Sequence, residues 1–165
     1  MYSSEAISAW FVNKGIDTSN YVTQMKVQKV VFFAQGLCLA FHGFPIVNEE
    51  FEAWKYGPVL PKIYRFYNRW GSMPITKKAE FGLVQDGNEI FGIDVFPDNI
   101  EKILDLTWEA TKNVDAAVLS GWTHIKGSPW DKHYIEGKNN RIPNEEIKAY
   151  FLEKVIKKKD GSDGK

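Results

Sequence analysis

The segment Phe51-Glu52-Ala53-Trp54-Lys55-Tyr56-Gly57-Pro58-Val59 mixes aromatic residues with charges directly before a Gly-Pro pair, a mixture that helix propensity does not explain. Side chains alternate between the two faces of an extended strand, so Glu52, Trp54 and Tyr56 would share one face. Glycine and proline interrupt regular structure and are common where a helix begins. We therefore expect a strand over residues 51–56, with the glycine capping a helix that has the proline at its first position.

A long, mostly apolar helix is predicted upstream of this strand. Thr23 can cap its start, and Gly43 follows its end. Its apolar residues recur at a near-helical spacing: Met25, Val30, Ala34, Leu37 and Phe41. Because apolar residues cover most of its circumference, we expect this helix to lie at the centre of the fold.

The same helix carries four long polar residues, Lys26, Gln28, Lys29 and Gln35, and two interpretations of them remain open. In the first, they form a solvated face, as on most amphipathic helices. In the second, one of the two glutamines is buried and hydrogen-bonds the 51–56 strand, because a buried amide must have partners.

The aromatic residues Trp54, Tyr56 and Trp130 also have two roles open to them. Large aromatic side chains are usually packed in cores, and we favour this role for all three. Trp and Tyr are also the residue types enriched at binding hot spots, so an exposed recognition surface is the alternative.

Helix and turn signals predict the remaining elements. Helices are expected from Ser3 or Ser4 to Gly15, over 58–70, from a capping box at 98–101, over 116–125 and from Pro143 onward, with a loop over 127–137. Segments 81–84 and 90–93 flank an Asp-Gly pair, which is a strong hairpin signal.

These elements predict one mainly helical α+β domain over residues 1–156. About six helices would surround or include the central apolar one, with one small antiparallel sheet of two or three strands. We expect the 81–93 hairpin to join the 51–56 strand in that sheet. Residues 157–165 are charged, carry two glycines and have no apolar anchor, so we expect a disordered tail.

Composition limits the classes of partner. Of the 165 residues, 44% are hydrophobic and 25% are charged, with 21 basic and 21 acidic residues. Without a basic excess the chain offers little attraction to a nucleic-acid backbone, so a nucleic-acid partner is not favoured. Its apolar runs are shorter than the ~20 residues of a membrane span, which argues against a membrane partner. The lone Cys38 lies in an apolar helix, which indicates a reduced thiol and a cytoplasmic location.

No arrangement of residues typical of a catalytic or metal site stands out. His124 and His133 lie near Asp131 and Glu136, but their spacing matches no recognised zinc pattern. We therefore expect a structural His124 and an exposed His133. A nucleophile pair of Cys38 and His124 is not favoured, because burial makes a thiol inert. The sequence predicts no enzyme activity, no metal and no cofactor.

Several of these residues together make the chain resemble the Panacea domain of SocA-like antitoxins, over roughly residues 4 to 152. The resemblance rests on Lys26-Val27-Gln28-Lys29, Phe32-Phe33-Ala34-Gln35, Ala53-Trp54-Lys55-Tyr56-Gly57-Pro58-Val59, Thr123-His124, Pro129-Trp130, Ile142, Ile147, Tyr150 and Phe151. It departs from the family at 126–128, where members often carry an acidic residue. As structural or partner-binding residues we take Lys26, Gln28, Lys29, Gln35, Glu52, Trp54, Tyr56, Gly57, Pro58, His124 and Trp130.

The resemblance implies an antitoxin that neutralises a cognate protein toxin by direct binding. In the SocA branch it also implies an adaptor that delivers the toxin to a ClpXP-type protease. Aromatic anchors would fill pockets on the toxin, while a polar rim fixes the register. Two alternatives remain: a small-molecule-sensing domain with a pocket lined by Trp54, Tyr56, His124 and Trp130, and a nucleic-acid-binding regulator.

Overall fold

The computed structural model describes residues 1–79, 82–85, 88–91 and 96–157, with only the backbone given at 82–85 and 88–91. The elements in chain order are α1 (Ser4–Asp17), α2 (Gln24–His42), β1 (Phe51–Trp54), β2 (Gly57–Val59), α3 (Pro61–Tyr67) with a 3₁₀ turn (Asn68–Trp70), β3 (Gly82–Gln85), β4 (Asn88–Phe91), α4 (Asp98–Thr111), α5 (Ala116–Thr123), α6 (Pro129–His133), β5 (Arg141–Ile142) and α7 (Asn144–Tyr150), which continues as a π-helix (Phe151–Ile156). The prediction of a mainly helical fold with a small antiparallel sheet is confirmed.

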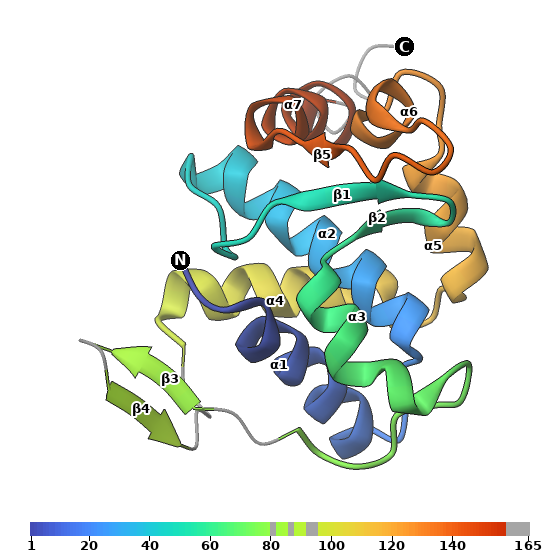
Figure 1. Cartoon of the computed structure of the whole chain (residues 1–165). Coiled ribbons are helices and arrows are strands. Elements are labelled where there is room, and N and C mark those ends of the chain that lie inside the picture. Colours follow the sequence, from blue (N-terminus) through green and yellow to red (C-terminus); the bar gives the residue numbers. More distant parts are fainter. Residues whose placement is uncertain (80–81, 86–87, 92–95, 158–165) are drawn as a thin grey trace, which may run out of the picture.

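Helix α2 is the centre of the molecule, as its apolar circumference predicted. Figure 1 shows it running diagonally between the sheet and α7 on one side and α1 and α4 on the other. Thr23 caps its start by accepting a hydrogen bond from the Lys26 amide (3.2 Å), and Gly43 ends it in the left-handed conformation at φ +79°. Both predicted ends of this helix are therefore correct.

The segment that follows β1 was wrongly predicted, because it reverses direction instead of entering a helix. Trp54 pairs with Gly57, so Lys55 and Tyr56 form a two-residue turn between the antiparallel strands β1 and β2. Gly57 has φ +113°, a conformation that residues with an L side chain rarely adopt. It allows the chain to enter β2 directly after the two-residue turn. Pro58 lies in edge strand β2, where its missing N–H is tolerated.

The helix begins at Pro61 instead, three residues later than predicted, and this second proline occupies its first turn. A Gly-Pro pair and an isolated proline are both valid start signals. Only the pairing of β1 with β2 decides between them.

The sheet shares one strand, β1, with the sheet we expected, and β2 and β5 take the places of the two strands of the 81–93 hairpin. Its order is β2-β1-β5, with Phe51 opposite Ile142 and Glu52 opposite Arg141. Strands β3 and β4 pair with each other in a separate two-stranded sheet, which Figure 1 places at the opposite end of the molecule from α5 and α6. The Asp86-Gly87 turn lies outside the described residues. Strand β5 has only two residues, too few for an alternating pattern to reveal it.

Three helix predictions need correction. Helix α1 continues through Gly15 and ends at Asp17. Gly15 is not a stop signal but a close-packing position, since a Cβ there would lie 2.7 Å from the Asn20 carbonyl oxygen. The expected 127–137 loop contains α6, which Ser128 caps by accepting from the Asp131 amide (3.1 Å). In the last helix, Ile147, Phe151 and Val155 are spaced four residues apart, which predicts one apolar stripe along an α-helix. The chain becomes π-helical from Phe151, so the stripe ends there and Val155 is 40% exposed.

Helix α4 packs its predicted apolar face, which carries Ile100, Ile103, Leu104 and Trp108, into the core. Its expected capping box is only partly formed. Pro97 is the N-cap residue, and Glu101 reaches back one residue further, to the Phe96 amide (3.1 Å).

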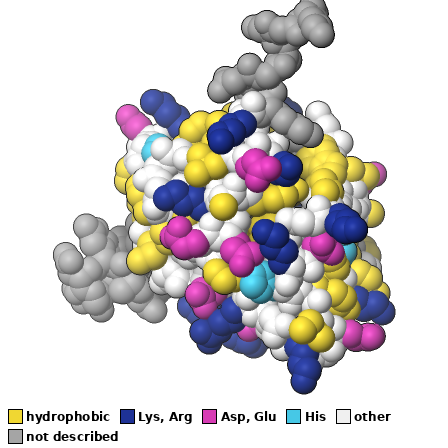
Figure 2. Space-filling view, turned by 90° about the horizontal axis from the view of Figure 1, so that it is seen from above, with side chains coloured by type: hydrophobic (Ala, Val, Ile, Leu, Met, Phe, Trp, Pro, Cys, Tyr) yellow, Lys and Arg dark blue, Asp and Glu magenta, His cyan; other side chains and the backbone are white. Residues whose placement is uncertain are grey.

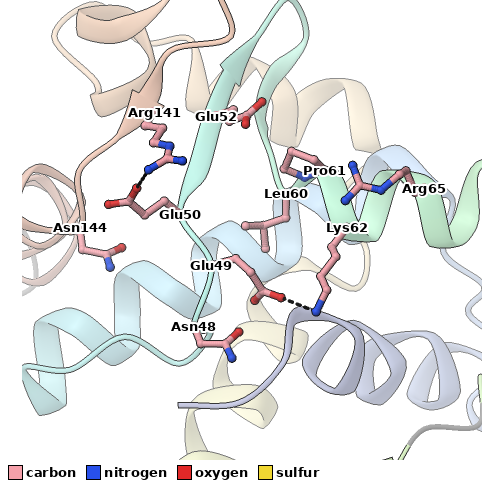
Figure 3. Close-up of a pocket in the computed structure, with 10 residues that line it drawn as sticks. All are labelled: Asn48, Glu49, Glu50, Glu52, Leu60, Pro61, Lys62, Arg65, Arg141 and Asn144. Atoms are coloured by element: carbon pink, nitrogen blue, oxygen red, sulfur yellow. Dashed lines mark hydrogen bonds and ion pairs between the residues drawn. The ribbon is translucent and has the colours of Figure 1, made fainter.

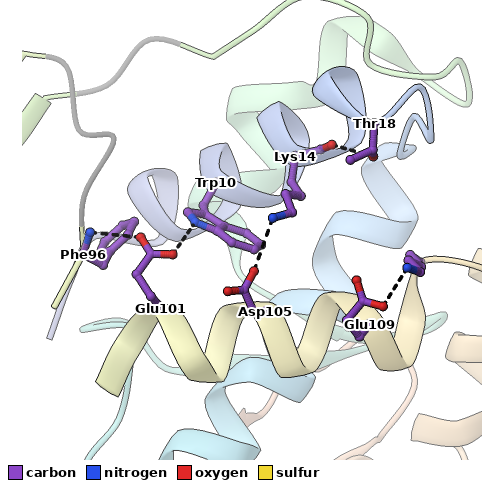
Figure 4. A network of polar contacts seen from close by, with 8 residues as sticks. Trp10, Lys14, Thr18, Phe96, Glu101, Asp105 and Glu109 are labelled. Carbon is purple, nitrogen blue, oxygen red and sulfur yellow. Dashed lines mark hydrogen bonds and ion pairs between the residues drawn. The ribbon is translucent and has the colours of Figure 1, made fainter. Parts of the chain in front are cut away.

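The other carboxylate oxygen of Glu101 accepts from the Trp10 indole (3.1 Å), and Lys14 pairs with Asp105 (3.3 Å). Figure 4 shows these contacts in a row between α1 and α4. They join two helices whose apolar faces both pack into the core.

The contact between α2 and the last helix is unusually close, because the Phe151 ring lies directly over Gly36. A Cβ at position 36 would overlap that ring, and Phe151 is only 1% exposed, so it has no free space to move into. Phe151 also meets the rings of Phe32 and Phe33 edge-on, at 6.0 Å each.

We expect Gly36→Ala to lower the free energy of unfolding by about 1–3 kcal/mol, because overpacking outweighs the gain in helix propensity. Gly121→Ala in α5 is the matched control, since no atom lies within 4 Å of its added Cβ. The control should raise stability by about 0.5–1 kcal/mol. Urea denaturation measures both, and equal stabilisation by the two changes would contradict the packing described.

Candidate functional site

The backbone between Trp54 and Leu60, here called the capped hairpin, has five carbonyl groups bound by side chains from α2, α5, α6 and the turn after α5. The pairs are Trp130 Nε1 to Trp54 O (2.6 Å), His124 Nε2 to Lys55 O (3.2 Å), Ser120 Oγ to Tyr56 O (2.8 Å), Lys29 Nζ to Pro58 O (3.1 Å) and Gln28 Nε2 to Leu60 O (3.1 Å). Carbonyl groups left unpaired in a protein interior are costly, so these side chains fix the path of the hairpin.

Gln28 binds this segment at two points. Its amide nitrogen donates to the Leu60 carbonyl, and its amide oxygen accepts from the Leu60 N–H (2.9 Å). The side chain is 3% exposed. Of the two interpretations, burial with satisfied amide groups is therefore correct, although Gln28 binds the backbone just beyond β2 and not the strand that carries Trp54.

Lys29 is a buried lysine without a carboxylate partner among the described residues. It is 1% exposed, and its ammonium group donates to the Pro58 carbonyl. Burial lowers the pKa of Lys29 from 10.5 to about 7. Gly57 leaves the space that the lysine needs, since a Cβ there would lie 2.8 Å from Lys29 Cε and 2.8 Å from Thr123 Oγ1.

The other two polar residues of α2 fasten other parts of the fold. Gln35, fully buried, accepts from the Ile46 and Val47 amides (2.9 and 3.1 Å) and donates to Asn144 at the start of α7 (2.9 Å). Lys26 donates to the Lys112 carbonyl at the end of α4 (2.8 Å), and burial lowers its pKa. The solvated-face interpretation is thus wrong for all four residues, because each is buried and its polar partners are backbone groups or, for Gln35, backbone groups and the Asn144 side chain.

His124 bridges α5 and the hairpin, in agreement with the structural role expected of it. Its Nδ1 lies 2.5 Å from the Ser120 carbonyl oxygen, and its ring centroid lies 3.8 Å from that of the buried Trp130. His133 is partly buried instead of exposed, with Nε2 3.0 Å from a Glu146 carboxylate oxygen.

Outside this framework the hairpin presents aromatic surface. Tyr56 is 61% exposed, so the core role expected for it is wrong, while the buried Trp130 has that role. Trp54 is half-buried; its indole donates to Glu52 (2.8 Å), and its ring lies 5.2 Å from that of Tyr64 on α3. Sequence reasoning missed Tyr64 and Ser120, since neither belongs to a motif. Tyr56 is exposed because it occupies a turn position that no alternation rule covers.

A charged groove of about 780 Å³ lies beside this aromatic surface (Figure 3). Glu49 and Lys62 pair across it at 3.3 Å, and Arg141 pairs with Glu50 at 3.3 Å. Glu49 also accepts from the Ser4 amide at the start of α1 (3.1 Å), so part of the lining is structural.

The groove does not match the pocket of the small-molecule alternative. Neither it nor a 360 Å³ cavity at residues 20–26 and 112–116 is lined by Trp54, Tyr56, His124 or Trp130. Those four side chains instead pack against other side chains or, in the case of Tyr56, face the solvent.

A metal site and a Cys38 nucleophile are the two chemistries on which the described residues bear. No group of three or more His, Cys, Asp or Glu side chains there is placed to hold a metal ion. Burial raises the pKa of the Cys38 thiol to about 11, which keeps it protonated and unreactive. In the part of the chain that the structure describes, no helix has the length and hydropathy needed to cross a membrane.

Comparison with known proteins agrees with the motif residues. The family model described as antitoxin SocA-like, Panacea domain, matches residues 27–131, which include every side-chain donor to the capped hairpin. The chain belongs to this family. It is 28% identical to antitoxin SocA of Caulobacter vibrioides (strain NA1000 / CB15N) over 128 residues, covering 78% of this chain and 68% of that protein. No solved structure matches the chain.

Lys29 gives this Panacea-domain protein a predictable pH dependence. Between pH 7 and 10.5 the unfolded chain binds a proton that folded Lys29 does not, so this group makes the free energy of unfolding rise with pH. Lys29→Met should flatten that slope by up to about 1.4 kcal/mol per pH unit between about pH 8 and 10.

The matched control is Gln24→Met on the same helix. It removes a hydrogen bond to the Tyr64 carbonyl (3.0 Å) but no titrating group, so it should lower stability at every pH without changing the slope. Urea denaturation across this pH range gives both slopes. Parallel curves for wild type and Lys29→Met would contradict a neutral buried lysine.

Proposed function

We propose that this protein is an antitoxin that neutralises a cognate protein toxin by direct, stoichiometric binding. The observation that carries the proposal is membership of the antitoxin SocA-like, Panacea domain family, with the match covering the whole capped hairpin and its donors. The name of its relative, antitoxin SocA, agrees with this role. A toxin would be the partner, and the free thiol of Cys38 suits the cytoplasm.

The rigidity of the capped hairpin supports a binding function. Side chains from three directions hold the hairpin, so its exposed Tyr56 is presented on a backbone that loses little conformational freedom on binding. Tyrosine and tryptophan dominate the energetics of many protein interfaces. We infer that Tyr56, with the neighbouring Trp54 and Tyr64 rings, contributes to the toxin contact.

An adaptor role would add a ClpXP-type protease as a second partner. The two mechanisms differ in what neutralisation requires. Occlusion needs only this protein at a ratio near equivalence, whereas an adaptor needs the protease and ATP. The resemblance to the SocA branch supports the adaptor role, and the capped hairpin is compatible with both mechanisms.

We expect titration of the purified toxin, taken as the product of the adjoining open reading frame, to abolish its activity near equivalence without protease. Tyr56→Ala should weaken binding on the order of tenfold or more, because truncating a hot-spot tyrosine of an interface costs over 1 kcal/mol. Phe44→Ala, another exposed aromatic (38%), is the matched control and should bind as wild type does.

Neutralisation that appears only with protease and ATP would replace occlusion by the adaptor mechanism. Lasting inactivation of the toxin by trace amounts of this protein would overturn the non-catalytic proposal, and full toxicity with both soluble proteins coexpressed would overturn the antitoxin role.

A further inference from the structure

Helix α5 has an outer face that nothing in the described structure covers. Its exposed residues are Ala117, Val118, Gly121 and Trp122, and the surface continues at Ile125, two residues beyond the end of the helix. None of the five is charged. The exposed fractions of Val118, Trp122 and Ile125 are 49%, 42% and 51%. The inner face is already used by the buried Leu119, Ser120 and Thr123.

The apolar side chains of this face are only partly covered by the rest of the described structure. Trp122 meets the Phe33 ring edge-on at 5.9 Å but keeps much of its surface in solvent, and space is open beside Gly121. Scattered exposed apolar residues are normal, whereas a contiguous uncharged helix face is typical of an interaction site. Figure 2 shows apolar surface continuing between the charged side chains on the face that carries α6, β5 and α7, toward the edge where Figure 1 places α5.

The hairpin and the charges around α5 narrow the kind of partner. Ser120, on the inner face of α5, and His124, the residue after the helix, bind the carbonyls of Tyr56 and Lys55, so the exposed turn lies against α5 at the border between its inner and outer faces. Lys126 follows the C-terminal end of α5, and Lys55 lies in the turn. Neither forms an ion pair with a described residue. The acidic Asp115 lies at the other end of α5, as its N-cap, so this surface is basic only at the C-terminal end of the helix and in the turn. An apolar centre that is basic at one end is complementary to an apolar face with acidic side chains at the matching end.

We propose that the outer face of α5, together with the Lys55–Tyr56 turn, docks an amphipathic helix of the cognate toxin, with acidic side chains toward Lys55 and Lys126. Val118 and Trp122, four residues apart on α5, form a ridge that suits helix-to-helix packing, and Ile125 extends the apolar surface beyond the end of the helix. This inference rests on the proposed antitoxin function and names the surface that performs it. The hairpin is then the rigid flank of the interface, and α5 supplies its apolar centre.

The test measures binding of the purified product of the adjoining open reading frame to full-length variants by calorimetry. Val118→Glu should weaken binding about 30-fold or more, as expected when a charge enters the centre of an apolar interface. Leu106→Glu on α4 is the matched control, because Leu106 is similarly exposed (44%) on a helix, and it should bind as wild type does. Lys126→Glu should slow association and reduce its dependence on salt.

The outcomes separate the two proposals. Absence of binding by wild type would overturn the antitoxin function and this inference with it. Wild-type affinity in Val118→Glu, with the toxin bound, would overturn the inference alone. Loss of self-association in Val118→Glu with unchanged toxin binding would likewise overturn it, since a second copy of this chain would then be the occupant. Circular dichroism and the denaturation midpoint are the controls that show whether these exposed substitutions leave the fold intact.

Discussion

The hydrogen bonds from helix side chains to the backbone of the capped hairpin are the constraint on which the rest of the structure depends. Gln28 and Lys29 reach the hairpin from α2, and Ser120, His124 and Trp130 reach it from α5, α6 and the turn between them. Each such bond contributes only about 1 kcal/mol net, but the bonds of Gln28 and Lys29 are buried, so losing either of these donors leaves a buried carbonyl unpaired at a cost of about 1–3 kcal/mol. The set therefore fixes one hairpin conformation, and with it the positions of β1, α3 and α5.

This arrangement explains why long polar residues lie on a central helix. An apolar side chain cannot satisfy the outer edge of β2, and an open strand edge invites pairing with other chains. Lys29 binds that edge and Gln28 binds the backbone just beyond it, at the energetic cost of burying an amine, which appears as the lowered pKa of Lys29. A hairpin held this way presents Tyr56 in one geometry, and the uncharged face of α5 lies beside it.

Much of the helical framework could be predicted from the sequence, because caps and apolar spacing are local signals. Thr23 and Gly43 bound α2 as expected. The errors lie where non-local pairing decides: the pairing of Trp54 with Gly57 turned an expected helix start into a hairpin, and the two-residue strand β5 left no pattern. The motif residues of the site were identified, and burial of a glutamine was one of two open interpretations, but the burial of Lys29 was not predicted, because the backbone group that binds it comes from a distant segment.

If α2 side chains hold the hairpin as firmly as packing holds the core, amide hydrogen exchange of Leu60 will report it, because this N–H donates to the Gln28 side chain and belongs to no helix or strand ladder. We predict that Leu60 exchanges only through global unfolding, with the same free energy of opening as core amides of α2. Exchange of Leu60 through local opening, at a much lower free energy than those amides, would contradict it.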